Sequence, residues 1–179
     1  MVALFQPRVQ SLFAEGDAAI IGHDKGRKLE ELVRYVFEKI PGVEFYKSNI
    51  INNPGSEEID VAFFNNKATK GFSFLENLLL VECKNWSSPV GASHVREFTT
   101  KLKHRACAYG VLIAVNGITG NAQDRTAAHD AVRMALAVEK IRVIVITRAE
   151  IELWADSADI IELFKKKLCE LTVDGSIFV

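Results

Sequence analysis

The chain of 179 residues is about the size of one domain, because domains commonly hold about 150 residues. Hydrophobic residues make up 49% of it and charged residues 25%, which excludes a disordered or fibrous chain. The net charge of −1 argues against a protein that coats nucleic acid or an anionic membrane through its bulk charge, and leaves room only for a local basic patch.

The first residues mix polar and charged side chains into the apolar positions, so we expect no signal peptide, and no stretch has the length and apolarity of a membrane span. The three cysteines, Cys83, Cys107 and Cys169, are far apart and form no CxxC pair, which fits reduced thiols in the core. The sequence therefore predicts a cytoplasmic protein with no membrane contact.

The predicted elements begin with a helical segment over residues 1–23 and a helix over residues 24–40, which Asp24 caps and Pro41-Gly42 ends. Two strands at 43–51 and 57–64 follow, divided by the turn at residues 52–55. The later elements are a strand at 78–86, a helix at 91–108, a strand at 109–115, a helix at 121–140, a strand at 141–147 and one or two helices within 150–171.

This order predicts an α/β fold with a mixed central sheet, antiparallel at its start and parallel later, with helices on both faces. The third strand begins with apolar residues on both faces, as a central strand does. The apolar tail from Leu171 to Val179 packs on this core or on another chain.

The third strand ends with charged residues. Glu82 and Lys84 are two residues apart and so project from one face of the strand, whereas Cys83 points to the other. Removing a charge from water costs several kcal/mol, so such residues need a partner, a metal or a ligand. If the second and third strands pair, Asp60 meets Glu82 across them.

Two carboxylates and a backbone carbonyl, for which we take that of Cys83, offer the hard oxygen ligands that suit Mg²⁺, with Mn²⁺ as the alternative. Lys84 can then orient a water molecule and offset charge in a phosphorane-like transition state. The alternative for Glu82 and Lys84 is an ordinary ion pair at the edge of the sheet, which contributes little to stability.

These motifs resemble the PD-(D/E)xK nuclease superfamily, and most closely its Mrr-like restriction endonucleases. Asp60 in ID and the VECK segment at 81–84 match the family's catalytic strands, with Ile59 in place of the family's proline. Gly26 and Glu30 in GRKLEE match its opening helix. VGASHVREF and AYGVLIAVNGITGNA resemble the helix, strand and loop that follow, so the resemblance spans about Lys25 to Thr147.

The resemblance implies a restriction-endonuclease-like three-layer α-β-α sandwich, here as a single domain over 1–179 with a core at about 24–147, an N-terminal helical segment at 1–23 and a C-terminal helical extension at 148–179. It implies a Mg²⁺-dependent endodeoxyribonuclease that leaves 5′-phosphate and 3′-hydroxyl ends. Asp60 and Glu82 would be metal ligands and Lys84 the catalytic lysine. Glu30 would be a further acidic catalytic residue, for which a solvated helix face is the alternative.

The helix after the catalytic strand carries basic residues that can follow a phosphate backbone. The candidates for nucleic-acid binding are Arg96, Lys101, Lys103 and Arg105. An ordinary solvated helix face explains the same residues equally well.

The biological role implied is restriction, phage defence or DNA repair. Specificity would come from a partner protein or from a homodimer, for which residues 160–179 are the candidate contact, with packing on the chain's own core as the alternative. Two other functions stay open: a catalytically silent nucleic-acid-binding or assembly module with a nuclease-like fold, and a small-molecule enzyme with a closed pocket.

Overall fold

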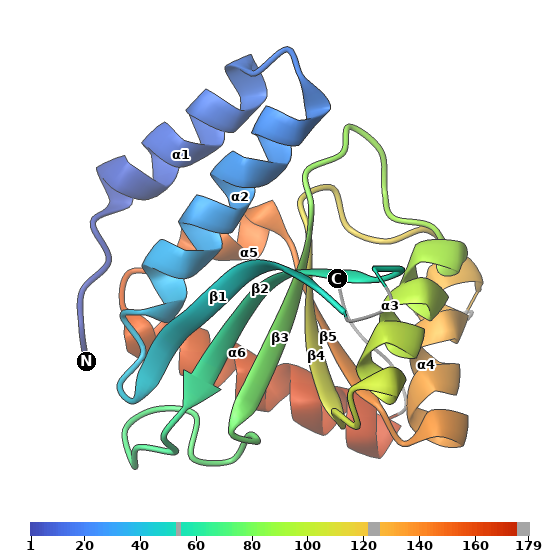
Figure 1. Cartoon of the computed structure of the whole chain (residues 1–179). Coiled ribbons are helices and arrows are strands. Elements are labelled where there is room, and N and C mark those ends of the chain that lie inside the picture. The colour runs from blue at the N-terminus through green and yellow to red at the C-terminus, as the bar shows by residue number, and fades with distance from the viewer. Residues whose placement is uncertain (53–54, 122–125, 175–179) are drawn as a thin grey trace.

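The computed structural model describes residues 1–52, 55–121 and 126–174 and has a central sheet between two layers of helices (Figure 1). Three predicted features lie partly outside the described residues: the turn at 52–55, the start of the helix predicted at 121–140, and the tail from 171 to 179. The described elements confirm the predicted three-layer α-β-α sandwich.

The sheet has five strands in the order β1-β2-β3-β4-β5. Strands β1, β2 and β3 pair antiparallel, whereas β3, β4 and β5 pair parallel, so the predicted mixed sheet with the third strand at its centre is confirmed. Their bounds are β1 (Val43–Ile51), β2 (Glu58–Asn65), β3 (Leu78–Lys84), β4 (Tyr109–Ala114) and β5 (Arg142–Ile146).

Four helices lie on one face of the sheet, with α1 outermost on α2 (Figure 1). Aromatic rings form the centre of this layer: the rings of Phe37 and Phe63 stack at 5.0 Å, and Phe164 packs edge-on against Phe37. This packing holds α2 and α6 against the sheet. The bounds are α1 (Gln6–Ala18), α2 (Gly22–Phe37), α5 (Arg148–Leu153) and α6 (Ser157–Cys169), which a π-helical turn (Glu170–Asp174) follows.

Helices α3 (Ala92–His104) and α4 (Ala127–Glu139) cover the other face. The approach of α3 to β4 depends on Gly110, because a Cβ there would lie 2.4 Å from Cδ1 of Leu102 and 2.7 Å from Cζ of Phe98. Helix α3 therefore sits close on the sheet, beside the end of β3 that carries the charged residues.

Several predicted boundaries are wrong: the strand predicted at 78–86 ends at Lys84, the helix predicted at 91–108 ends at His104, and the helix predicted at 24–40 ends at Phe37 and starts earlier than predicted. Helix α2 begins at Gly22 with Ile21 as its N-cap residue, so Asp24 lies within the first turn and does not cap the helix. A carboxylate in the first turn still interacts favourably with the positive end of the helix dipole. Among the described residues, none of the helices has both the length and the apolar character that crossing a membrane requires.

Candidate active site

Strands β2 and β3 separate at the point where their charged residues lie. Their ladder runs from Phe64 opposite Leu78 to Val61 opposite Val81, and the next pair in register would be Asp60 opposite Glu82. There the Asp60 side chain replaces the ladder, since its Oδ2 accepts the backbone N–H of Cys83 at 2.6 Å. The predicted antiparallel pairing of the two strands is confirmed, and it brings Asp60 close enough to Glu82 for the charge of Glu82 to raise the pKa of Asp60.

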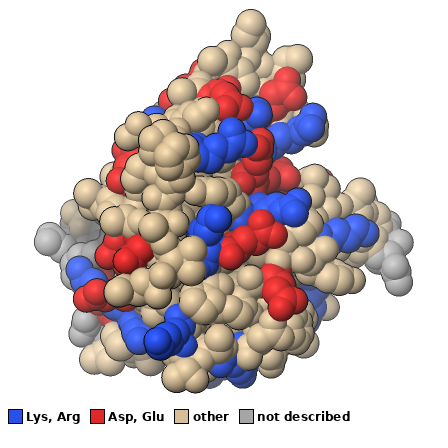
Figure 2. Space-filling model, turned by 90° about the vertical axis from the view of Figure 1, so that its left-hand side faces the viewer, with Lys and Arg blue, Asp and Glu red and all other residues tan. Residues whose placement is uncertain are grey.

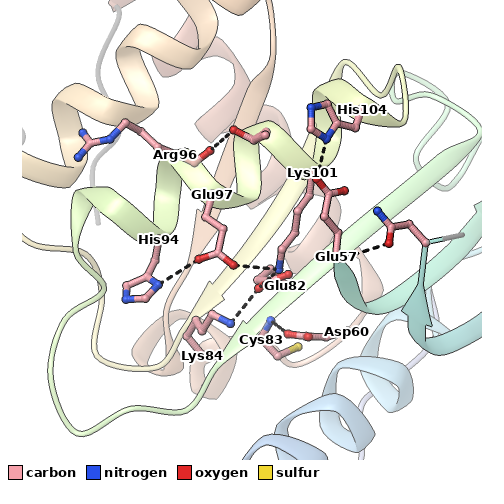
Figure 3. Close-up of polar contacts among 12 residues, drawn as sticks. Glu57, Asp60, Glu82, Cys83, Lys84, His94, Arg96, Glu97, Lys101 and His104 are labelled. Atoms are coloured by element: carbon pink, nitrogen blue, oxygen red, sulfur yellow. Dashed lines mark hydrogen bonds and ion pairs between the residues drawn. The ribbon is translucent and has the colours of Figure 1, made fainter. Parts of the chain in front are cut away.

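Glu82 is almost fully buried, and one of its two oxygens carries all of its hydrogen bonds. Oε1 accepts from Lys84 Nζ at 2.8 Å and from Lys101 Nζ at 2.9 Å (Figure 3). Oε2 is shielded from solvent and has no hydrogen-bond partner in the described part of the chain. A buried carboxylate oxygen without a donor is costly, and cation ligation is a common reason for it.

The site raises the pKa of one of its carboxyl groups. Burial, followed by the charge of Glu82, raises the pKa of Asp60 from 3.8 to about 6, although the Cys83 N–H opposes this shift. Burial acts to lower the pKa of Lys84, but the Glu82 carboxylate outweighs it and the pKa of Lys84 is raised. The site thus concentrates negative charge, which a cation would relieve.

The backbone of Cys83 faces β2. In an extended strand the N–H and C=O of one residue point to the same edge, so the carbonyl of Cys83 points toward β2, as its N–H does toward Asp60. The thiol belongs to the apolar cluster on the face covered by α2, and burial raises its pKa well above the usual value. Only the carbonyl of this residue is therefore suited to hold a hard cation.

Glu30 approaches the site from α2. Asn49 Nδ2 donates to its Oε2 at 3.4 Å, and burial raises the pKa of Glu30. The charge of Glu30 also contributes to the raised pKa of Asp60. The structure thus places Glu30 beside the site, within electrostatic reach of Asp60.

The basic residues of α3 do not share one environment. Arg96 is exposed and points away from the carboxylates (Figure 3). Lys103 is exposed, with Nζ 2.6 Å from Glu139 Oε2. Arg105 is largely buried, with Nη1 2.6 Å from Glu57 Oε2.

Lys101 differs from the prediction that placed it on an open basic face. Its side chain is 9% exposed and extends into the site, where it contacts Glu82. The physical reason is the rotation of α3, which the close packing of Phe98 and Leu102 against Gly110 determines. The sequence allowed this placement without requiring it, because Lys101 lies three residues after Phe98 and next to Leu102, at the edge of the apolar stripe of the helix.

The loop after β3 brings an aromatic side chain to the site. The Trp86 ring lies 5.6 Å from Lys84 Nζ and 4.6 Å from the His94 ring. Asn85, next to it, donates its side-chain N–H to the Lys25 carbonyl at 3.2 Å. This bond ties the end of the catalytic strand to the first turns of α2, the helix that carries Glu30.

A cleft of about 610 Å³ opens beside Glu30, between the α1–α2 pair and β1. Its lining includes Arg27, Arg34, Ser48 and Asn49. On the face of the molecule that carries α1, α2 and β1, acidic and basic side chains are interspersed, and neither kind forms a continuous patch (Figure 2). This face therefore lacks the uniformly basic surface that bulk binding of nucleic acid requires.

A family model described as a restriction endonuclease, Mrr_cat, matches residues 24–154. No curated protein matches the chain. The matched region holds all five strands and nearly all of α2, and so includes every residue of the site described above. Because the match covers most of the chain and the sheet has the expected mixed topology, the chain belongs to the Mrr_cat family of restriction endonucleases, whose activity is that of a nuclease acting on DNA.

Proposed function

We propose that this chain is a Mg²⁺-dependent endonuclease that hydrolyses phosphodiester bonds of DNA, with Asp60, Glu82 and Lys84 as its catalytic residues. One observation carries the proposal. Where β2 and β3 separate, the Asp60 and Glu82 carboxylates come together beside the Lys84 ammonium, and the buried Glu82 Oε2 has no partner within the described residues.

The residues fit a divalent cation. Two carboxylates and the Cys83 carbonyl are hard oxygen donors, which Mg²⁺ prefers and Mn²⁺ accepts. Bound there, the cation would act as a Lewis acid toward a phosphoryl oxygen and lower the pKa of a water molecule. The unpartnered Oε2 of Glu82 and the raised pKa of Asp60 both support this assignment.

Lys84 acts on the substrate side. Its raised pKa keeps the ammonium protonated, so we assign it the roles of orienting the attacking water and offsetting negative charge on the phosphoryl oxygens. The water oxygen bonds to phosphorus, the bond from phosphorus to the 3′ oxygen breaks, and that oxygen leaves with a proton as the 3′-hydroxyl. Glu30 supports the site directly or through a water molecule.

Contacts with DNA are assigned to α3 and the loop before it. Arg96 is exposed and free to meet a phosphate, whereas Lys103 and Arg105 would have to exchange their present carboxylate partners for phosphates. Trp86 is well placed to contact a nucleotide beside Lys84. Lys101 is not part of this surface.

We infer that the chain acts in the cytoplasm as one domain, in restriction, phage defence or repair. Cutting both DNA strands requires two active sites, which a homodimer would supply, and residues 160–179 remain our candidate contact, of which 175–179 lie outside the described residues. A specificity partner is the other arrangement that we consider.

The test is cleavage of supercoiled and linear DNA, methylated and unmethylated, with Mg²⁺, Mn²⁺ or EDTA. We expect metal-dependent cutting by the wild type and none by Asp60→Ala or Lys84→Ala. The control is Lys39→Ala, two residues beyond the C-terminal end of α2, which should cut normally. Cutting by the Asp60 and Lys84 variants at the wild-type rate would exclude this site, and an inert wild type on every substrate would favour the silent binding module.

A further inference from the structure

Two lysines share one oxygen of Glu82, and they differ in how firmly they are held. Lys84 Nζ and Lys101 Nζ lie 2.8 and 2.9 Å from Glu82 Oε1. Lys84 stands at the last residue of β3 with its side chain 20% exposed, whereas the Lys101 side chain is 9% exposed and is carried on α3. The helix itself is fixed by its close packing on Gly110.

Lys101 has one weaker partner. Glu97, one turn earlier on α3, has its Oε1 3.7 Å from Lys101 Nζ, but its side chain is 61% exposed. An exposed carboxylate at this distance contributes little. Glu82 is therefore the main counter-charge of the Lys101 ammonium.

We propose that Lys101 is a positioning residue that remains on Glu82 Oε1 as its fixed counter-ion, keeps Oε2 directed at the cation, and so leaves Lys84 free to move to water and phosphate. The inference rests on the proposed function, because it assigns Lys101 a part in the same site. A single lysine would have to neutralise Glu82 and serve the substrate at once. With Lys101 in place, Glu82 keeps a buried partner when Lys84 leaves it.

The test replaces Lys101 by Met, which keeps an unbranched side chain one atom shorter and removes the charge. The matched control is Lys167→Met, which removes another buried lysine that pairs with a glutamate, on the opposite face of the sheet. Three experiments are made. The electron paramagnetic resonance of free Mn²⁺ gives Mn²⁺ binding without DNA, steady-state cleavage of DNA gives kcat and KM, and thermal unfolding gives the unfolding temperature.

Lys101→Met should bind Mn²⁺ about tenfold more tightly, because it removes a positive charge next to the cation's ligand. Its kcat should fall about tenfold or more with KM nearly unchanged, because Lys84 must then stay on Glu82. Lys167→Met should unfold at a lower temperature with Mn²⁺ binding and kcat unchanged. Lys101→Arg, which keeps the charge, should restore Mn²⁺ binding to the wild-type value.

A kcat for Lys101→Met within twofold of wild type would overturn the inference, because Lys101 would then have no part in catalysis. Mn²⁺ binding that weakens together with a lowered unfolding temperature would also overturn it, because both changes fit a structural lysine.

The two proposals can fail separately. If the wild type binds Mn²⁺ but cuts no DNA, the proposed function fails and the role of Lys101 is still tested by Mn²⁺ binding. Tighter Mn²⁺ binding by Lys101→Met would then still support the assignment of Lys101 as the counter-ion of Glu82, and unchanged binding would overturn that assignment. A wild type that neither binds Mn²⁺ nor cuts DNA overturns both.

Discussion

Among the described residues, Lys101 and Lys167 are lysines with side chains less than 10% exposed, and each pairs with a glutamate, Lys101 on one face of the sheet and Lys167 on the other. The two glutamates differ in how their oxygens are satisfied. Lys167 Nζ lies 2.7 Å from Glu150 Oε1, while Glu150 Oε2 accepts from the backbone N–H and hydroxyl of Thr147 at 2.8 and 3.0 Å. Both oxygens of Glu150 are therefore satisfied. In the pair of Lys101 with Glu82, a second lysine joins the same oxygen and the other oxygen has no partner in the described chain.

The difference separates a structural pair from one suited to function. The pair of Lys167 with Glu150 joins α6 to the capping box at the start of α5. One oxygen of Glu150 binds the lysine of α6 and the other closes the capping box, so both help to hold the two helices together. The Glu82 pair leaves an acceptor unsatisfied beside a carboxyl group whose pKa is raised. Unsatisfied buried groups and raised pKa values lower stability, and they are typical of sites that bind a ligand.

The largest effect is expected from Glu82→Gln. The substitution keeps the shape of the side chain but removes the charge that would hold the cation, so several kcal/mol of transition-state stabilisation are lost and cleavage should fall by about a thousandfold or more. Steady-state cleavage with Mg²⁺ measures this. Glu150→Gln is the matched control and should keep the wild-type rate; similar losses in both variants would show that the two pairs do not differ in the way described.

Lys167→Met should cost about 3 kcal/mol of unfolding free energy, because it leaves the Glu150 carboxylate, whose side chain is only 21% exposed, without its lysine partner. Urea unfolding followed by circular dichroism gives the value. A loss of unfolding free energy below about 1 kcal/mol would mean that water solvates Glu150 in the variant, and that the pair of Lys167 with Glu150 does not have the structural role assigned to it.

Asp60→Asn should stabilise the protein at neutral pH in EDTA while abolishing cleavage. The folded-state pKa of Asp60, about 6, lies above the usual 3.8, so the folded state binds the proton more tightly than the unfolded state does. The stability of the wild type therefore falls by about 2–3 kcal/mol as the pH rises from about 4 to 6. Above that range the contribution of Asp60 to stability is constant.

The measurement is the difference in unfolding free energy between Asp60→Asn and wild type from pH 4 to 8. Asparagine can still accept the Cys83 N–H through its Oδ1, so this bond is kept as a control on geometry. A difference that does not change with pH would show that Asp60 ionises in the folded protein as it does in the unfolded chain.

The smallest effect is expected from Glu30→Gln, because Glu30 stands beside the site and reaches Asp60 through its charge alone. We expect kcat to fall about tenfold, which corresponds to a loss of about 1.4 kcal/mol of transition-state stabilisation. Mn²⁺ binding should change little. Glu31→Gln, one residue along α2 in an exposed pair with Lys28, is the control. Full activity of Glu30→Gln would favour the solvated-face interpretation of this residue.

Much of the fold could be predicted because its signals are local. Short apolar runs bounded by turn residues mark β2 and β3, helical spacing marks α2, and the order of the elements predicts the mixed sheet with β3 at its centre. The start of α2 could not be placed from Asp24, because the helix begins two residues earlier, and Ile21 precedes it without a side-chain cap.

The sequence by itself determined which carboxylates meet, because an antiparallel register between two recognisable strands brings Asp60 opposite Glu82 and puts Lys84 on the face of Glu82. Only the tertiary structure decided the place of Lys101. A charged residue at the edge of an amphipathic stripe can face water or the core, and here the contact of Phe98 and Leu102 with Gly110 sets the rotation of α3. That rotation depends on the packing of α3 against β4, a contact between two elements that the spacing of residues within α3 does not reveal. It places a second ammonium on Glu82.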